Sequence, residues 1–389
     1  MSSDSARTET KTRIPVTLVT GFLGSGKTTF INAALRSPEL AKTVVVVNEF
    51  GEVGLDHQLF ASSSDSVVVL ENGCLCCTVR SDLVGTLNSL YYARQASEIP
   101  SFDNVVIETS GLAEPGAVLQ AFLSEPTLDG LYRIAGVVTL VDAVNWRGTA
   151  ETHDEAVRQV ALADQIRITK LDLADDRRSV ASRLLLELRR TNPSAEIAEI
   201  DWTSAAVARL LTISGFDTSD PLADPRPWLA LQTYQKAADD HHDHRHHDHD
   251  RHEHDHRHPA HLEGRGIENF VLMRDSPLTR EEVQFLLEGI GQNLGAGLLR
   301  VKGLVNIAEE PGRPAVIQGA QHLLHTMTWL DRWPDADQRT RIVFITQGIQ
   351  RESLKDIIDL LDRVSSRTFK ARAKGRQAQE AAKATAQTQ

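Results

Sequence analysis

The apolar positions in the first half of the chain fall into short runs rich in valine and isoleucine, separated by longer segments of helical period. Such runs are typical of buried strands. Strands are predicted at residues 16–20, 43–48, 66–71, 104–108, 136–142, 165–169 and 196–200. Helices are predicted at residues 27–35, 81–92, 113–123 and 177–190. This alternation predicts an α/β fold, in which a mostly parallel sheet carries helices on both faces.

The pattern changes after residue 216. Residues 217–263 lose the periodicity and lead into a block of histidine and aspartate, so they are predicted to form a linker or long loop. Apolar segments that could form a second core are found at residues 270–273, 280–287, 298–308, 315–318, 342–346 and 354–361. Their strand and helix signals are mixed without crossover regularity, which predicts a smaller α+β domain. The predicted division is a disordered N-terminus (1–13), a nucleotide-binding domain (14–216), the linker (217–263), a C-terminal domain (264–369) and a flexible tail (370–389).

Length and charge restrict the classes of function and of partner that the chain can have. The 389 residues correspond to roughly two domains, and 41% apolar composition is enough for a core in each. The chain has 42 Lys and Arg against 53 Asp and Glu, a net charge of −11, which argues against nucleic acid as a partner. The polar start has no secretory pattern, and no apolar run is long enough to span a membrane. We therefore expect a cytoplasmic protein with no membrane partner.

The first predicted strand runs directly into a glycine-rich segment that matches the pattern G-x-x-x-x-G-K-[ST]. Its key residues are Gly21, Gly24, Ser25, Gly26, Lys27, Thr28 and Thr29. Backbone N–H groups in such a loop point at phosphate oxygens. Lys27 would reach the outer phosphates and also serve catalysis, and Thr28 offers a hydroxyl ligand to Mg²⁺. The segment predicts a nucleoside triphosphate site, with a ligand-free glycine turn as the alternative.

A P-loop alone leaves ATP and GTP open, so the base-reading element has to lie elsewhere. Residues Thr169, Lys170 and Asp172 close a predicted strand in a T-K-x-D pattern. In the usual N-K-x-D form, the aspartate accepts from guanine N1 and N2 while the lysine stem covers the ring. Thr169 replaces the asparagine but the key acceptor remains. The segment favours GTP, with an ordinary polar loop as the alternative.

A further apolar strand ends in Glu108 and continues to Gly111. A carboxylate at the tip of a strand beside the P-loop can hold Mg²⁺ through water or orient the attacking water, and Gly111 can offer a backbone N–H to the γ-phosphate. Glu108 and Gly111 are therefore predicted catalytic residues. A surface position at a strand end is the alternative for Glu108. Asp142, at another strand end, is either part of the site or a local cap.

All three cysteines of the chain, Cys74, Cys76 and Cys77, fall within four residues. An odd number of closely spaced cysteines without an export signal argues for thiolates rather than disulfides. Such a cluster suits tetrahedral Zn²⁺ or another thiophilic metal, with the fourth position left to another group. Glu49 and Asp56 are candidates for further coordination. Buried structural cysteines are the alternative.

Ten of the fifteen histidines lie in residues 239–258, together with seven Asp or Glu and three Arg. Such a tract is a flexible, multivalent ligand for Zn²⁺, Ni²⁺ or Co²⁺. The candidate ligands chosen from it are His241, His242, His244, His246 and His247. The tract is expected to capture or store metal, with a solvated polyampholyte loop as the alternative.

In combination, these motifs resemble the CobW-type GTPases, metal-handling relatives of the nickel-insertion GTPases of hydrogenase and urease maturation. The resemblance rests on residues 21–29, 48–56, 73–77, 108–115 and 169–172, and extends through a CobW-type C-terminal domain. It implies a GTPase metallochaperone in which GTP and Mg²⁺ order the switch segment and the cysteine motif into a metal site. Hydrolysis then releases Zn²⁺ to a client metalloprotein, and assembly into an oligomer would follow the nucleotide state.

Three other functions stay open from the sequence. Cobalt (Co²⁺) handling for cobalamin synthesis or metalloenzyme activation belongs to the same class. A P-loop kinase would prefer ATP and need an acceptor site, against which Lys170 and Asp172 argue. A non-catalytic metal buffer would rely on the histidine tract and would tolerate the loss of the P-loop and the cysteines.

Overall fold

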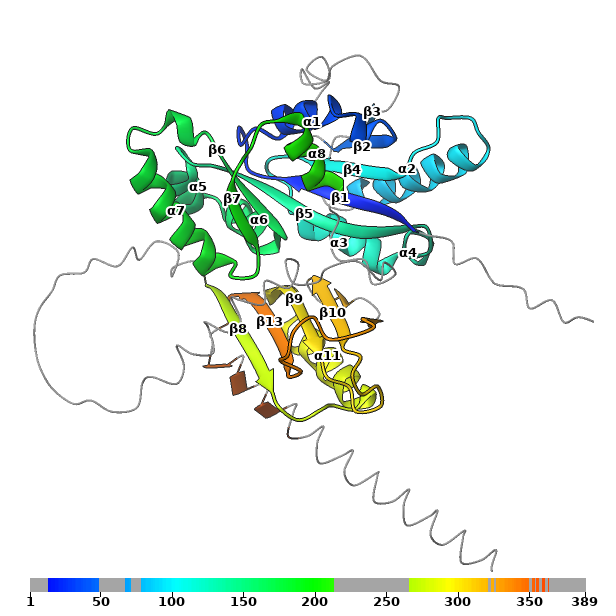
Figure 1. The fold of residues 1–389 in the computed structure, drawn as a ribbon, viewed down its shortest axis with the longest axis vertical. Coiled ribbons are helices and arrows are strands. Elements are labelled where there is room, and N and C mark those ends of the chain that lie inside the picture. The colour runs from blue at the N-terminus through cyan, green and yellow to red at the C-terminus, as the bar shows by residue number, and fades with distance from the viewer. Residues whose placement is uncertain are drawn as a thin grey trace, which may run out of the picture.

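The computed structural model describes residues 13–48, 67–70, 78–212, 266–320, 323–324 and 327–349, and a few positions between 352 and 363. Two bodies are visible in Figure 1, one coloured blue to green and one coloured yellow to orange. No helix in the described ranges is long and apolar enough to cross a lipid bilayer. Residues 1–12 of the predicted N-terminus, the predicted linker and the predicted tail lie outside these ranges.

The first body is built on a seven-stranded sheet in the order β3-β2-β4-β1-β5-β6-β7. The strands are β1 (Ile14–Thr20), β2 (Thr43–Asn48), β3 (Val67–Leu70), β4 (Asn104–Thr109), β5 (Tyr132–Asp142), β6 (Gln165–Thr169) and β7 (Glu196–Glu199). Every pair of neighbours is parallel. The predicted parallel sheet is therefore confirmed. β5 begins four residues earlier than predicted, because residues 132–134 pair with the start of β1.

Eight helices of this body are described: α1 (Lys27–Leu35), α2 (Thr78–Gln95), α3 (Pro115–Ser124), α4 (Pro126–Leu131), α5 (Trp146–Thr152), α6 (Asp154–Leu162), α7 (Arg177–Thr191) and α8 (Ser204–Thr212). Successive side chains of a strand point to opposite faces. In β2, Val44 and Val46 join the core formed with α2 and α3, whereas Val45 and Val47 join the core formed with α1 and α8. The sheet is thus covered on both faces, as predicted.

Four of these helices, α4, α5, α6 and α8, are absent from the sequence prediction. All four span six to nine residues, which is shorter than the window of about 11–18 residues over which a helical period shows in a sequence. In the structure α6 buries Val157 and Val160 together with Ala156 and Ala161. The omission matters because α6 contacts both the nucleotide-binding segments and the second body.

The second body is an antiparallel sheet in the order β11-β10-β9-β13-β8, with β12 also paired to β10. Its strands are β8 (Ile267–Arg274), β9 (Leu298–Val305), β10 (Ala315–Ala320), β11 (Leu323–Leu324), β12 (Thr328–Trp329) and β13 (Thr340–Gln347). The helix α11 (Arg280–Leu294) packs its apolar stripe on this sheet. Thr279 and Glu282 form a capping box at its start, which satisfies amides that the helix leaves open. This arrangement confirms the predicted α+β domain.

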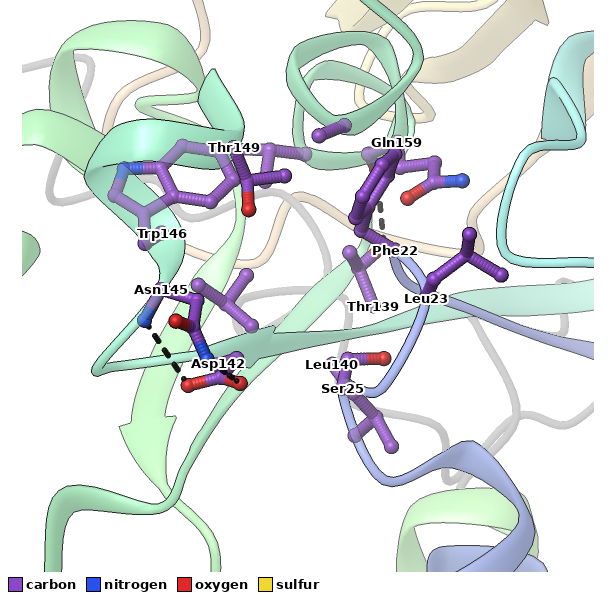
Figure 2. A pocket seen from close by; sticks show the side chains of 13 residues that line it. Phe22, Leu23, Ser25, Thr139, Leu140, Asp142, Asn145, Trp146, Thr149 and Gln159 are labelled. Carbon is purple, nitrogen blue, oxygen red and sulfur yellow. Dashed lines mark hydrogen bonds between the residues drawn. The ribbon is translucent and has the colours of Figure 1, made fainter. Parts of the chain in front are cut away.

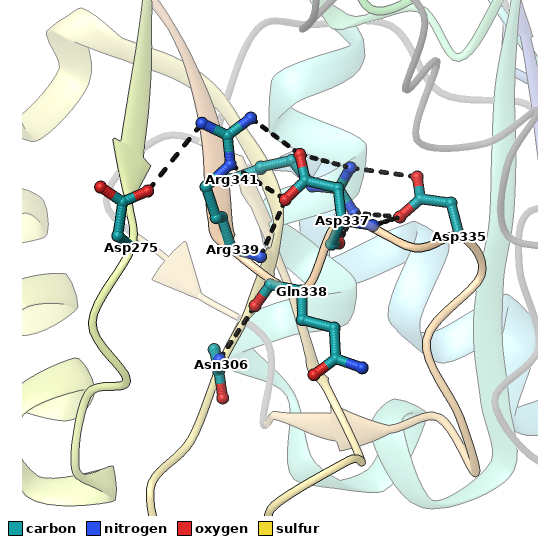
Figure 3. Close-up of polar contacts among 7 residues, drawn as sticks. All are labelled: Asp275, Asn306, Asp335, Asp337, Gln338, Arg339 and Arg341. Carbon is teal, nitrogen blue, oxygen red and sulfur yellow. Dashed lines mark hydrogen bonds and ion pairs between the residues drawn. The ribbon is translucent and has the colours of Figure 1, made fainter.

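A buried arginine organises the loop that leads into β13 (Figure 3). The Arg341 side chain is fully buried. Its guanidinium donates to both carboxylate oxygens of Asp335 and to the backbone carbonyl oxygen of Asp337, and it forms an ion pair with the Asp337 carboxylate at 3.6 Å. Arg339 also binds Asp337 and, through its hydrogen bond, holds the pKa of that carboxyl below its ordinary value. A buried charge is tolerated when it is paired and hydrogen-bonded, so these pairs explain how Arg341 can lie inside the domain.

A second buried ion cluster joins the two bodies. Asp164, between α6 and β6, contacts Arg300 and Lys302 of β9. Burial alone would raise the pKa of Asp164, but the positive charges of Arg300 and Lys302 outweigh it and hold the pKa below its ordinary value. Burial lowers the pKa of Lys302 to about 8. Apolar packing surrounds the cluster, since Ala161 of α6 belongs to a core with Leu299 and Val343.

Candidate nucleotide site

The P-loop connects β1 to α1 and depends on glycines at three positions. Gly21, Gly24 and Gly26 have φ angles of 143°, 74° and 98°, which side chains with a Cβ rarely adopt. A Cβ on Gly21 would also lie 2.5 Å from the carbonyl oxygen of Leu140. Gly26 is the N-cap of α1 and offers no side-chain cap. The first amides of α1 are therefore open to an anion.

A cavity of about 300 Å³ lies over the P-loop and the end of β4. It is lined by Leu23, Gly24, Gly26, Lys27, Thr28, Thr29, Val47, Glu108, Thr109, Ser110 and Gly111. The predicted phosphate-binding and catalytic residues therefore meet at one place, apart from Gly21 and Ser25. The Lys27 ammonium donates to the carbonyl oxygens of Gly21, at 2.9 Å, and Phe22, at 3.4 Å. These bonds hold the charge across the loop, where it would meet phosphate oxygens.

Ser25 faces away from this cavity. Its side chain is 1% exposed, and its Oγ lies 2.6 Å from the position of a Cβ on Gly21. It lines a smaller cavity of about 20 Å³ behind the loop, together with Phe22, Trp146 and Gln159 (Figure 2). The side chain of Ser25 is therefore a structural part of the loop, and its backbone N–H donates to the carbonyl oxygen of Phe22 at 3.1 Å.

Glu108 is the fifth residue of the buried strand β4 and is only 7% exposed. Its Oε1 lies 3.5 Å from the Thr28 hydroxyl, with which it makes a hydrogen bond. A hydroxyl and a carboxylate side by side at the edge of a phosphate-sized cavity are oxygen ligands of the kind that Mg²⁺ prefers. The residues present therefore fit a magnesium ion.

Gly111 lies against the P-loop so closely that no other residue fits. A Cβ at this position would be 2.7 Å from the backbone nitrogen of Leu23. The segment is held from behind by Gln159 of α6, whose amide donates to the carbonyl oxygens of Gly111, at 3.1 Å, and Ala113, at 3.0 Å. Gln159 was missed by sequence reasoning. It is 1% exposed, on the buried face of a short helix, and nothing in the sequence around it distinguishes it.

The predicted base-reading segment follows β6 at the same edge of the sheet. The Thr169 hydroxyl, which is buried, donates to the carbonyl oxygen of Ser25 at 2.9 Å and so braces the P-loop. Lys170 adopts a left-handed conformation with φ 58° and pairs with Asp142 at 2.7 Å. Asp172 lies in the 3₁₀ turn η3 (Leu171–Leu173), where it is exposed. Its carboxylate is therefore accessible to a ligand.

Asp142 has a structural role in this segment. Its carboxylate accepts hydrogen bonds from Lys170 and from the backbone of Val144 and Asn145. Burial would raise the pKa of Asp142, but the hydrogen bonds from Lys170, Asn145 and Val144 outweigh it and lower the pKa. Asp142 thus stays charged and fixes the lysine that follows β6.

Apart from Thr28, the predicted metal ligands lie outside the described residues. They are Cys74, Cys76, Cys77, Glu49, Asp56, His241, His242, His244, His246 and His247. The ranges that are described contain no group of three or more His, Cys, Asp or Glu side chains placed to hold a metal ion. The predicted site for the transferred metal would therefore be built from ligands within residues 49–66, 71–77 and 213–265.

Comparison with known proteins agrees with this geometry. The family model for the CobW/HypB/UreG nucleotide-binding domain matches residues 15–199, and the model for the cobalamin synthesis protein cobW C-terminal domain matches residues 267–361. The zinc chaperone YjiA of Escherichia coli (strain K12) is 31% identical over 342 residues, covering 88% of this chain and 96% of that protein. The zinc chaperone CobW of a Sinorhizobium species is 32% identical over 260 residues, covering 60% and 70%.

A solved structure is similar over both bodies. The crystal structure of the Zn(II)-bound YjiA GTPase from E. coli superimposes with a TM-score of 0.60 at 26% identity, and the match covers 90% of this chain and 99% of that chain. The matching models, the relatives and the shared fold agree with the resemblance seen in the motifs. The chain belongs to the CobW-type GTPase family.

Proposed function

We propose that this protein is a GTP-hydrolysing metallochaperone that binds Zn²⁺ through Cys74, Cys76 and Cys77 and transfers it to client metalloproteins. The observation that carries the proposal is the meeting of Lys27, Thr28, Glu108 and Gly111 around one phosphate-sized cavity. Relatives that span most of the chain are named zinc chaperones, which supports zinc as the cargo.

The proposed chemistry is assigned residue by residue. Lys27 neutralises the outer phosphates, and Thr28 with Glu108 would hold Mg²⁺, which supplies positive charge to the phosphates. Glu108 also orients the attacking water through its carboxylate. The Gly111 N–H binds the γ-phosphate, and Asp172 binds the guanine edge. Among the described residues, those lining the cavity include no arginine, which supports slow intrinsic hydrolysis that a client or partner accelerates.

The topology suggests how nucleotide and metal communicate. The cysteines lie in the seven residues that connect the end of β3 to the start of α2. In a parallel sheet the carboxyl ends of all strands share one edge, which here is the edge of the P-loop and Glu108. If nucleotide orders this connection, each ligand favours the other by the same factor. Hydrolysis would then lower zinc affinity and promote transfer.

The histidine tract has the separate role of capture. Ten imidazoles within residues 239–258 give a high local concentration of weak ligands. Cobalt remains the alternative cargo, since three thiolates also accept Co²⁺. A pure metal buffer would have no use for Thr169 and Gln159 bracing the phosphate-binding segments.

Phosphate release from GTP and from ATP tests the enzymatic part. Wild type is expected to hydrolyse GTP in preference to ATP. Lys27→Ala should abolish hydrolysis, and Asp172→Asn should remove most of the preference for GTP, because an amide presents a donor where guanine needs an acceptor. The Asp129→Asn variant, at an exposed ion pair with Arg13, serves as the control. Equal hydrolysis by wild type and Lys27→Ala would contradict the proposal.

A further inference from the structure

Trp202 is an exposed tryptophan with no part in the core around it. It lies in residues 201–203, between β7 and α8, and is 41% exposed. Trp146 and Trp333, by comparison, are 5% and 9% exposed. The core at this point is completed by Ile200, Val207 and other apolar residues that do not include Trp202. An exposed indole is therefore a candidate for contact with a ligand.

The sheet places Trp202 beside the base-reading segment. β6 and β7 are parallel neighbours, and the Ile200 amide donates to the carbonyl oxygen of Ile168 at 3.0 Å. The chain therefore leaves both strands side by side at one edge of the sheet. The segment after β6 carries Lys170 and Asp172, and the segment after β7 carries Trp202.

The indole also reaches the P-loop. Its Cη2 lies 3.7 Å from the position that a Cβ would take on Gly26, the last glycine of the loop. The helix α1 follows the P-loop and the helix α8 follows the segment of Trp202, and these two helices share one core. Trp202 does not line the phosphate cavity, so the ring lies at the P-loop but outside the place of the phosphates. The Asp201 carboxylate accepts from the Thr203 amide at 2.9 Å, which fixes the turn that carries the ring.

We infer that Trp202 stacks on the base of the bound nucleotide. The inference rests on the proposed function, since it takes Asp172 as the residue that reads the guanine edge. Aromatic side chains stack on any base because every base has a π-face. Trp202 thus increases affinity for purine nucleotides in general, whereas Asp172 selects guanine. Because Trp202 supplies affinity for the base, selection of guanine needs only the carboxylate of Asp172. This chain keeps that carboxylate although Thr169 replaces the usual asparagine.

Calorimetric titration with GDP, GTP and tripolyphosphate, each with Mg²⁺, tests the assignment. Trp202→Ala should weaken binding of GDP and GTP about tenfold or more, whereas Trp202→Phe, which keeps an aromatic face, should stay within about threefold of wild type. Tripolyphosphate has no base, so its affinity should be equal in all three proteins. Unchanged GDP affinity in Trp202→Ala would overturn the inference, as would an equal loss of tripolyphosphate affinity.

Fluorescence gives an independent readout. GDP should quench the tryptophan emission of wild type and of the control Trp329→Phe, in which a tryptophan of the other body is replaced. Trp202→Phe should lose the quenching while still binding GDP by calorimetry. Quenching that persists in Trp202→Phe overturns the stacking. A wild type that binds neither GDP nor GTP contradicts the proposed function itself, so the two failures are distinguishable.

Discussion

At the scale of single residues, Thr169 shows how a departure from a motif can be compensated locally. The sequence predicted a weakened guanine-reading segment because threonine replaces asparagine. In the structure the Thr169 hydroxyl donates to the carbonyl oxygen of Ser25 and so ties the segment to the P-loop. A threonine can make this bond because its hydroxyl is a donor. The key acceptor, Asp172, is unaffected.

Replacing Thr169 tests this role. Thr169→Val keeps the shape but leaves a buried carbonyl without its donor, which costs about 1–3 kcal/mol. We expect GDP affinity to fall about fivefold or more, measured by calorimetry. Thr169→Ser, which retains the hydroxyl, is the matched control and should stay near wild type. Equal affinity in Thr169→Val and wild type would show that the bond does not support the nucleotide site.

The residue scale also marks the limit of prediction from sequence. The P-loop could be predicted because its function depends on consecutive residues and on backbone shape. Gln159 and Trp202 could not be, because each acts on residues more than 40 positions away and no local pattern distinguishes it. The sequence left two roles open for Asp142, in the nucleotide site or as a local cap. Its hydrogen bonds from Lys170, Val144 and Asn145 indicate the structural role.

At the scale of elements, the helix α6 contacts both the segment of Gly111 beside the P-loop and the sheet of the second body. Gln159 holds the carbonyl oxygens of Gly111 and Ala113. The preceding residue, Arg158, pairs with Glu114 after Gly111 and donates to Gln347 of β13 at 2.6 Å. Two adjacent residues of one short helix thus contact both residues 111–114 and the second sheet. The sequence prediction lacked this helix because nine residues are too few for a helical period to stand out.

A variant of α6 separates binding from hydrolysis. Gln159→Met removes two hydrogen bonds to the Gly111 segment while filling the same space. We expect the kcat for GTP hydrolysis to fall about fivefold or more, since each bond contributes about 0.5–1.5 kcal/mol to holding Gly111 in place. GDP affinity should change little because GDP has no γ-phosphate. Gln284→Met, on the exposed surface of α11, is the control. An unchanged kcat would contradict the positioning role.

At the scale of the whole molecule, the buried cluster of Asp164, Arg300 and Lys302 joins the two bodies. Removing one partner of a buried pair leaves an uncompensated charge, which costs about 3–5 kcal/mol. The sequence predicted two domains but not their contact, because the partners are separated by more than a hundred residues. This contact connects the turn between α6 and β6 to β9, and so holds the C-terminal sheet against the nucleotide-binding domain.

Acidification tests the cluster. The pKa of Asp164 is lowered in the folded protein, so the unfolded chain takes up a proton first as pH falls below about 4. The contribution of Asp164 to stability is therefore present above that pH and lost below it. Urea unfolding should show a steeper loss of stability below pH 4 in wild type than in Asp164→Asn. Asp129→Asn, at an exposed pair, should follow wild type. Parallel curves for wild type and Asp164→Asn would refute this role.

The proposed function requires that nucleotide and zinc binding are coupled in one molecule. The most direct measurement is a competition titration of Zn²⁺ against a chromophoric chelator, with and without Mg²⁺ and a non-hydrolysable GTP analogue. It should use the chain lacking residues 239–258, so that the histidine tract does not contribute. We predict that the nucleotide tightens zinc binding about tenfold or more, and that Cys76→Ser abolishes the tight site. Zinc affinity that is unchanged by the nucleotide, or by Cys76→Ser, would contradict the account.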